Sequence, residues 1–276
     1  MPDASAKPND SVNPLATPEP WDLVAAGYTA EALPYFESFS RAALRAAKLP
    51  ARARIVDVAA GPGTLSMLAA AAGATVSAID ISEQMLAAFR ERVATAGLAG
   101  AIDIRQGDGQ ALPFESGAYD GAFSMFGLMF FPDRLAGLRE MRRVLRPGGR
   151  AIVSSWVPFD GPFGELLKTA RDFIPGVPLG GGPPPLGNPE EIRRELAAAG
   201  FAAVDVETVE YQLSAPSFDA FWDSMERTNA PLVLLKHRLG ARWTELAPKI
   251  RARVRTTLGE GPLVVGRGAY LGIGTA

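Results

Sequence analysis

The chain has 276 residues, 47% of them hydrophobic, with a formal net charge of −2 and a sequence pI of about 5.6. This length and apolar content predict one elaborated globular domain or two small ones. The slightly acidic balance gives no positive field that would gather nucleic acid or an anionic membrane. Because there is no cysteine, disulfides, thiolate metal sites, iron–sulfur clusters and cysteine nucleophiles are excluded.

The first twenty residues contain five prolines among small polar residues, without a basic stretch followed by an apolar one. This composition predicts a flexible arm over residues 1–20 rather than a signal peptide. No later segment has the roughly 18 consecutive apolar residues that a membrane span requires. We therefore expect a cytoplasmic protein with a single domain over residues 21–276, of unspecified oligomeric state.

Strand-like and helix-like segments alternate through the chain after a helical entry segment at 21–48. Strands are expected at 54–59, 75–81, 101–105, 119–126, 151–157, 204–213 and 263–273, with helices between most of them. Alternation of this kind predicts an α/β fold, with a mostly parallel sheet and helices on both of its faces. The core of this fold is expected to cover residues 50–157.

Two segments interrupt the alternation. Residues 158–188 contain seven prolines and a run of three glycines, too many for an ordinary crossover, and are expected to form a surface insertion. Residues 217–258 have a helical pattern throughout and are expected to form a helical cap. Both segments follow late strands of the sheet, so we expect them to lie near the ligand-binding edge.

A glycine turn joins the first strand to the following helix. Gly61 and Gly63 allow backbone amides to approach a ligand, because a Cβ would block the approach or forbid the dihedral angles. Asp80 ends the second strand nineteen residues after Gly61, where an acid can accept hydrogen bonds from both hydroxyls of a ribose. The same spacing suits a nicotinamide dinucleotide, but Ser66 replaces the third glycine of that fingerprint.

Two further acids follow strands at the same edge. Asp57 lies inside the otherwise apolar first strand, where dinucleotide sites usually have an apolar residue. It requires a hydrogen-bonding partner, and a ligand ammonium would serve. Asp108 follows the third strand, where a carboxylate can accept a hydrogen bond from the exocyclic amine of adenine. With Asp80, these acids form a series at successive strand ends, along the crevice where doubly wound folds bind ligands.

Five motifs occur in the order known from one family. They are VDVAAGPG (56–63), AIDIS (78–82), GDGQALPF (107–114), YDGAFSMFGLMFF (119–131) and LRPGGR (145–150). Together they cover roughly residues 50–157, and their joint occurrence is far more specific than any one of them. The chain resembles class I S-adenosylmethionine-dependent methyltransferases of the ubiquinone and menaquinone biosynthesis type.

The resemblance implies a Rossmann-like, seven-stranded sheet with an antiparallel last strand, and S-adenosylmethionine as cofactor. It places the methionine part of the cofactor against the turn at Ala59, Gly61 and Gly63, and the ribose on Asp80. The adenine would lie between Ile81 and Met85, with its edge on Asp108 and Gly109. Ser124 and Phe126 would line the methyl-transfer face, and Asp57 completes the expected set of cofactor-binding residues.

The acceptor is less defined by the sequence. The family's histidine pair after the fourth strand is replaced by Met129 and Phe130, so a quinone-type acceptor does not follow from the resemblance. Candidates for the acceptor pocket are aromatic or apolar, namely Trp21, Tyr28, Phe126, Met129 and Trp156. Apolar residues of the two interrupting segments are expected to exclude water there, among them Phe159, Phe163, Trp222 and Trp243.

No catalytic base is assigned. His237, the only histidine, lies in a basic helical stretch and is interpreted as a surface residue, as are the cations around it. No metal site is expected. The predicted function is methyl transfer to a small, apolar or aromatic acceptor. The alternatives are a nicotinamide-dependent oxidoreductase and a protein that binds S-adenosylmethionine without catalysis.

Overall fold

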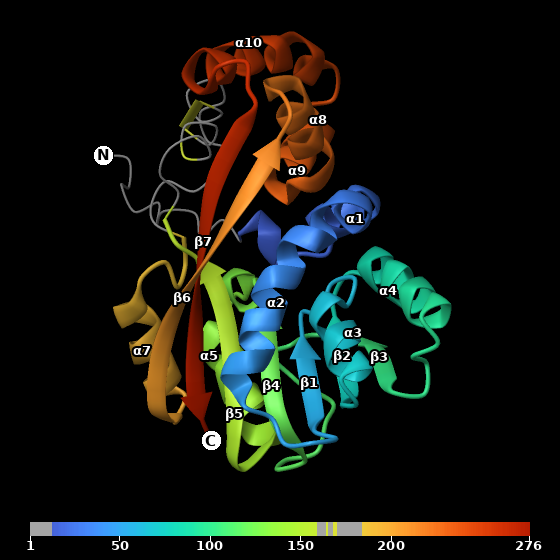
Figure 1. The fold of residues 1–276 in the computed structure, drawn as a ribbon, viewed down its shortest axis with the longest axis vertical. Helices are drawn as coiled ribbons and strands as arrows, with labels where there is room; N and C mark the ends of the chain where they lie inside the picture. Colours follow the sequence, from blue (N-terminus) through green and yellow to red (C-terminus); the bar gives the residue numbers. More distant parts are fainter. Residues whose placement is uncertain (1–12, 159–163, 165–167, 170–183) are drawn as a thin grey trace, which may run out of the picture.

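A seven-stranded sheet organises the chain (Figure 1), and the computed structural model describes residues 13–158, 164, 168–169 and 184–276. The strands are β1 (Arg54–Val58), β2 (Thr75–Asp80), β3 (Ile102–Gln106), β4 (Tyr119–Met125), β5 (Leu145–Trp156), β6 (Ala202–Ala215) and β7 (Leu263–Thr275). Their order is β3-β2-β1-β4-β5-β7-β6. Strands β1 to β5 pair in parallel, whereas β7 is antiparallel to both β5 and β6. The expected mostly parallel sheet with an antiparallel last strand is confirmed.

Helices cover both faces of this sheet (Figure 1). One face is covered by α2 (Leu33–Ala47), α3 (Thr64–Ala71) and α4 (Glu83–Thr95), and the other by α5 (Arg134–Val144) and α7 (Pro189–Ala198). From β1 the chain proceeds outward to β2 and β3 and then returns to β4 on the other side of β1. This reversal opens a crevice at the carboxyl ends of β1 and β4.

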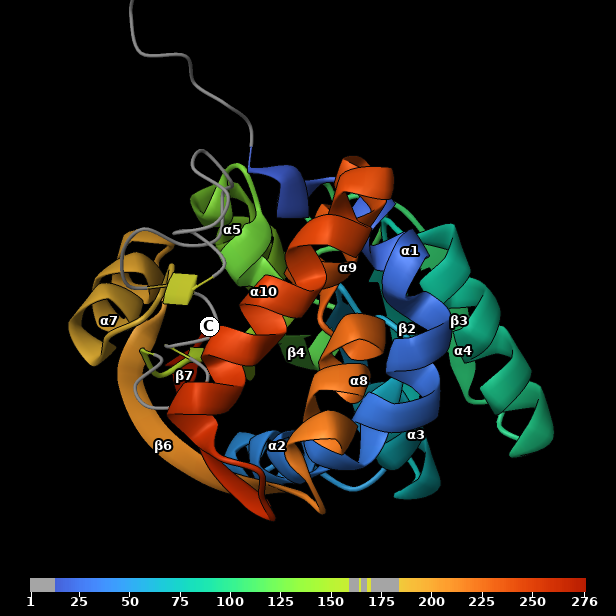
Figure 2. The same ribbon diagram turned by 90° about the horizontal axis from the view of Figure 1, so that it is seen from above.

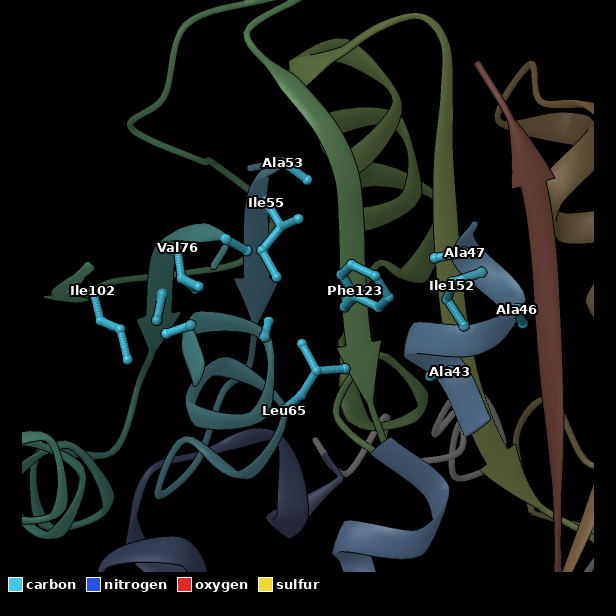
Figure 3. Packing of buried hydrophobic residues seen from close by; sticks show 14 of the residues in the cluster. Ala43, Ala46, Ala47, Ala53, Ile55, Leu65, Val76, Ile102, Phe123 and Ile152 are labelled. Atoms are coloured by element: carbon cyan, nitrogen blue, oxygen red, sulfur yellow. The ribbon is translucent and has the colours of Figure 1, made fainter. Parts of the chain in front are cut away.

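The core on the α2–α3 side consists of small and branched side chains (Figure 3). Phe123 of β4 and Ile55 of β1 are fully inaccessible to solvent, and Leu65 of α3 packs against the same cluster. Ala43 and Ala47 give α2 a small-residue face, which lets the helix approach the sheet closely. Side chains of β1 alternate between the two faces, since Val56 belongs to the cluster on the α5 side.

The segment expected to form a helical cap contains three helices, α8 (Phe218–Thr228), α9 (Ala230–Leu239) and α10 (Ala241–Leu258). It is inserted between β6 and β7, which extend beyond the other strands to reach it (Figure 1). Trp222 and Trp243 are buried within the cap's own cluster, packed with Ile250 and Val254. Seen from above, α8 to α10 and α1 (Glu19–Gly27) lie over the strand ends (Figure 2).

Regular secondary structure begins within residues 1–20, the segment that is expected to be a flexible arm. Within that arm, residues 14–16 form a 3-10 turn and α1 begins at Glu19. Asn13 caps the turn by accepting from the Leu15 N–H at 3.1 Å, and Pro14 and Pro20 stand at first-turn positions, where no N–H is needed. The side chain of Asp22 then ties α1 to α4, accepting from the Ser82 hydroxyl at 2.6 Å.

One further expectation differs from the structure, and another falls mostly outside the described residues. Strand β5 begins at Leu145 instead of 151, because the LRPGGR segment already pairs with β4 through Leu145 opposite Tyr119. Most of the insertion at 158–188, including Phe159 and Phe163, lies outside the described residues. Within the described part of the chain, no helix is both long and apolar enough to cross a membrane.

Candidate active site

A cavity of about 550 Å³ opens at the carboxyl ends of β1 to β5. Its floor comes from the loops that follow the strands, and its roof from residues 13–21 and from Thr228, Asn229, Ala230 and Pro231 at the start of α9. This volume falls within the range of small-molecule sites. The cavity divides into a polar part near β1 to β3 and an aromatic part near β4, β5 and β7.

The glycine turn after β1 forms one wall of the polar part. Ala59, Gly61 and Gly63 have φ angles of +57°, +55° and +76°, the left-handed region in which a Cβ is strained. A Cβ on Gly61 would meet no atom within 4 Å, whereas one on Gly63 would lie 1.9 Å from the ring of Phe89. Gly61 therefore keeps the backbone open to the cavity, and Gly63 lets the turn approach α4.

Asp80 lies at the centre of the polar part. Its Oδ2 accepts the Gly61 N–H at 2.8 Å, and its Oδ1 accepts the Ser82 N–H at 2.9 Å. Burial raises the pKa of Asp80, whereas the N–H groups of Ser82 and Gly61 act in the opposite direction by stabilising the charged form. The carboxylate thus joins the turns after β1 and β2 and lines the cavity between them.

Asp57 is 1% exposed and accepts the Ser66 hydroxyl at 2.7 Å through its Oδ2. Burial raises its pKa to about 7; the hydrogen bond from Ser66 lowers it, and the nearby Asp80 raises it. Two buried acids therefore face the cavity around the same glycine turn. A cationic group between them would relieve both the desolvation and their mutual repulsion.

The polar part continues along the ends of β2 and β3. Ile81, Met85, Asp108 and Gly109, which the sequence analysis expects at the adenine, all line the cavity. Asp108 is oriented by the next loop, since its Oδ1 accepts the Gln110 N–H at 2.8 Å. Met85 is 2% exposed and packs with residues of α1 and α9. Together they form an apolar slot with an acid at its rim. Such a slot suits a heteroaromatic base.

The aromatic part is built around Phe126 and Trp156, whose rings stack with centroids 4.0 Å apart. Phe126 has a φ angle of +58°, which is rare for a bulky residue, and its N–H donates to the Ser154 hydroxyl at 2.9 Å. Tyr28 and Phe36 stack at 4.9 Å and line the same part of the cavity. The site therefore joins an acid-lined half to an aromatic half.

Comparisons with known proteins agree with this geometry. Residues 56–153 match the family model described as a methyltransferase domain. An uncharacterised protein of Mycobacterium tuberculosis is 40% identical over 127 residues, which are 46% of this chain and 45% of that protein. A ubiquinone/menaquinone biosynthesis C-methyltransferase of Cellvibrio japonicus is 39% identical over 123 residues, 43% of this chain and 48% of that enzyme. The chain thus spans less than half the length of these relatives.

The match to the family model covers the glycine turn, all three strand-end acids and β4. Residues 56–153 are therefore similar to a methyltransferase domain. The YcgJ protein of Bacillus subtilis shares the fold of this chain, with a TM-score of 0.59 over 86% of this chain and 97% of that protein, at 17% identity. At this identity, the similarity to that protein is one of fold alone.

Nine of the eleven predicted cofactor residues line the cavity: Asp57, Ala59, Gly61, Asp80, Ile81, Met85, Asp108, Gly109 and Phe126. Gly63 and Ser124 do not line it. Gly63 faces Phe89, and the Ser124 hydroxyl is buried and accepts the Leu128 N–H at 3.1 Å, which orients the loop after β4. Both residues shape the turns that carry the site.

The aromatic and apolar candidates for the acceptor pocket, Trp21, Tyr28, Met129 and Trp156, also line the cavity. His237 lies on the exposed last turn of α9 and does not. Trp222 and Trp243 stabilise the cap itself instead of covering the site. In the described part of the chain, no cluster of three or more histidine or acidic residues could hold a metal ion.

Sequence reasoning missed three contributors. Phe36 of α2, Arg267 of β7 and the Asn229 turn before α9 all line the cavity. None follows an early strand, so no local motif marks them. Phe36 could have been found from the aromatic run in its helix, but the placement of Arg267 depends on the antiparallel pairing of β7 with β5.

Proposed function

We propose that this chain binds S-adenosylmethionine in the polar part of the cavity and methylates a small, apolar or aromatic acceptor in the aromatic part. The observation that supports this most directly is the position of Asp80. Its carboxylate is fixed by two backbone N–H groups at the edge of the cavity, and it still lines that cavity. Such a carboxylate is suited to accept hydrogen bonds from a pair of ribose hydroxyls.

The other cofactor contacts follow from this placement. The adenine would lie in the slot between Ile81 and Met85, with Asp108 and Gly109 at its amine edge. The methionine part would extend along Gly61 toward Asp57. The buried Asp57, whose pKa is raised to about 7, gains stabilisation when the ammonium of that part approaches. The residues present therefore fit the group.

The chemistry requires little from the protein beyond position. When bound along Gly61 and Asp80, S-adenosylmethionine would supply a methyl group that its sulfonium activates for transfer to the acceptor. Phe126, Trp156 and Phe36 would hold a flat acceptor against the cofactor, where alignment alone can give a large acceleration. The roof residues 13–21 and 228–231 exclude water from the reacting atoms.

Recognition of the acceptor is assigned to the late segments of the chain. The cap at 217–258 contributes Thr228 to Pro231 to the cavity, and Pro184 and Pro185 contribute from the end of the 158–188 insertion. Exchanging these two segments with those of a related methyltransferase should change acceptor preference and leave cofactor affinity intact. A collapse of cofactor affinity with unchanged acceptor preference would contradict this assignment.

Turnover provides the test of the function as a whole. The protein should convert S-adenosylmethionine to S-adenosylhomocysteine faster in the presence of members of an aromatic acceptor library than without them. Two alternatives give different results. A nicotinamide-dependent oxidoreductase would be stabilised against heat by the dinucleotide, and a catalytically silent protein would bind S-adenosylmethionine without acceptor-dependent turnover across the library.

A further inference from the structure

Tyr28 lines the cavity but takes no part in the cofactor contacts proposed above. It begins the single π-helical turn Tyr28–Ala32, which joins α1 to α2. Such turns are rare in helices and are frequent at functional sites. The backbone just before it is held by the cap, since a Cβ on Gly27 would lie 2.3 Å from the carbonyl oxygen of Arg227 in α8. The position of Tyr28 is therefore fixed by the helix that carries it and by the cap.

The Tyr28 ring lies where the two parts of the cavity meet. It stacks on Phe36 with ring centroids 4.9 Å apart, and Phe36 in turn contacts the Phe126 ring edge-on at 5.4 Å. On the polar side, Tyr28 packs against the cluster of buried residues that contains Met85. A group that is transferred from the polar part to the aromatic part would therefore pass beside this side chain.

The Tyr28 hydroxyl is neutral and open to a ligand. Burial raises its pKa well above the ordinary value for tyrosine, and the nearby Tyr35 and Asp80 raise the pKa further, so the group keeps its proton at neutral pH. Among the residues that the structure describes, none forms a hydrogen bond with this hydroxyl. A buried tyrosine hydroxyl usually has a partner, and this one can donate one hydrogen bond and accept another. A ligand in the cavity would supply the partner.

The cofactor groups proposed above already have partners, because Asp57, Asp80 and Asp108 are assigned to them. The Tyr28 ring instead belongs to the aromatic part through its contact with Phe36. From this arrangement, which rests on the proposed function, we infer that the Tyr28 hydroxyl binds an oxygen or nitrogen atom on the aromatic ring of the acceptor. The acceptor is then a phenol or an aromatic amine instead of a hydrocarbon. An acceptor without this atom would leave the hydroxyl unsatisfied where water is excluded, and this difference provides specificity.

The test compares matched ligands with and without the polar atom. Phenol, 2-naphthol and 2-naphthylamine are compared by calorimetry with fluorobenzene and 2-fluoronaphthalene, in which fluorine replaces the polar group, and the protein is saturated with S-adenosylhomocysteine. The wild type should bind at least one polar ligand about tenfold more tightly than its fluorinated analogue. Tyr28→Phe should lose this preference and keep its affinity for the fluorinated analogue, because the ring still stacks on Phe36.

Two controls separate the possible failures. Tyr211→Phe removes a hydroxyl from the aromatic cluster around Phe126, and it should behave as the wild type, because Tyr211 is not among the described residues that line the cavity. S-adenosylhomocysteine affinity is measured first, because its absence in the wild type refutes the proposed function itself. Tyr28→Phe should keep this affinity, and a large loss would overturn the inference by assigning the hydroxyl to the cofactor. Equal binding of polar and fluorinated ligands by the wild type, an unchanged preference in Tyr28→Phe, or no binding of any polar ligand would also overturn it.

Discussion

Replacement of Asp57 by asparagine should stabilise the free protein at alkaline pH. The carboxyl is buried, and its pKa rises from 3.8 to about 7 on folding. Because the folded-state pKa is the higher one, the favourable contribution of the protonated acid is present below pH 4 and is lost as the pH rises through 7. At about 1.4 kcal/mol for each pKa unit, the ionised form costs at most about 4 kcal/mol above pH 7.

Asparagine has nearly the same shape and can still accept the Ser66 hydroxyl, but it has no charge to bury. We compare the free energy of unfolding of the variant with that of the wild type. This difference should increase in favour of the variant by about 3 kcal/mol between pH 5 and pH 8. Urea denaturation of both proteins without ligand measures this difference. Asp103→Asn, which alters an exposed acid paired with Arg105, serves as the control. An advantage that is the same at both pH values would refute the reasoning.

Three further predictions concern the cofactor and the glycine turn. Asp80→Ala should weaken S-adenosylhomocysteine binding roughly tenfold to hundredfold in calorimetry, because charge-assisted hydrogen bonds of about 1.5 to 3 kcal/mol are lost; unchanged affinity would remove Asp80 from the ribose. Gly63→Ala should lower the melting temperature more than Gly61→Ala, since only the former drives a Cβ into Phe89; the reverse order would contradict the packing. A chelator should leave methyl transfer unchanged, and loss of activity that magnesium restores would show a metal requirement.

Much of this architecture can be predicted from local sequence signals. The run from Arg54 to Val58 followed by Gly61 specifies a strand, a turn and a helix within a few residues, and all three are present. Asp80 and Asp108 could be placed together because the carboxyl ends of parallel strands meet at one edge. These inferences succeed because strand alternation and turn chemistry act over short distances.

Other features depend on contacts that sequence spacing does not encode. Ser124 has the polarity of a ligand-binding residue, but its hydroxyl is used within the loop after β4. Arg267 enters the cavity only because β7 pairs with β5 in the register that places Trp156 opposite Ala269. Residues 13–20 are ordered because Trp21 and Asp22 anchor them, through the Leu15 carbonyl and the Ser82 hydroxyl.

The roof of the cavity shows how distant segments combine. Glu19 and Glu31, in α1 and the turn after it, pair with Arg238 and Arg227 of the cap. These pairs are exposed and each contributes little to stability. They nevertheless align α1 with α8 and α9, and residues from both segments line the site. The sequence of either segment alone does not predict this arrangement.

Titration of the purified protein with S-adenosylhomocysteine in a calorimeter, with a nicotinamide dinucleotide as the comparison ligand, tests the central claim most directly. The arrangement of Asp80, Asp57 and the glycine turn predicts saturable binding of one S-adenosylhomocysteine per chain and no heat from the dinucleotide. Binding of the dinucleotide without binding of S-adenosylhomocysteine would contradict the account.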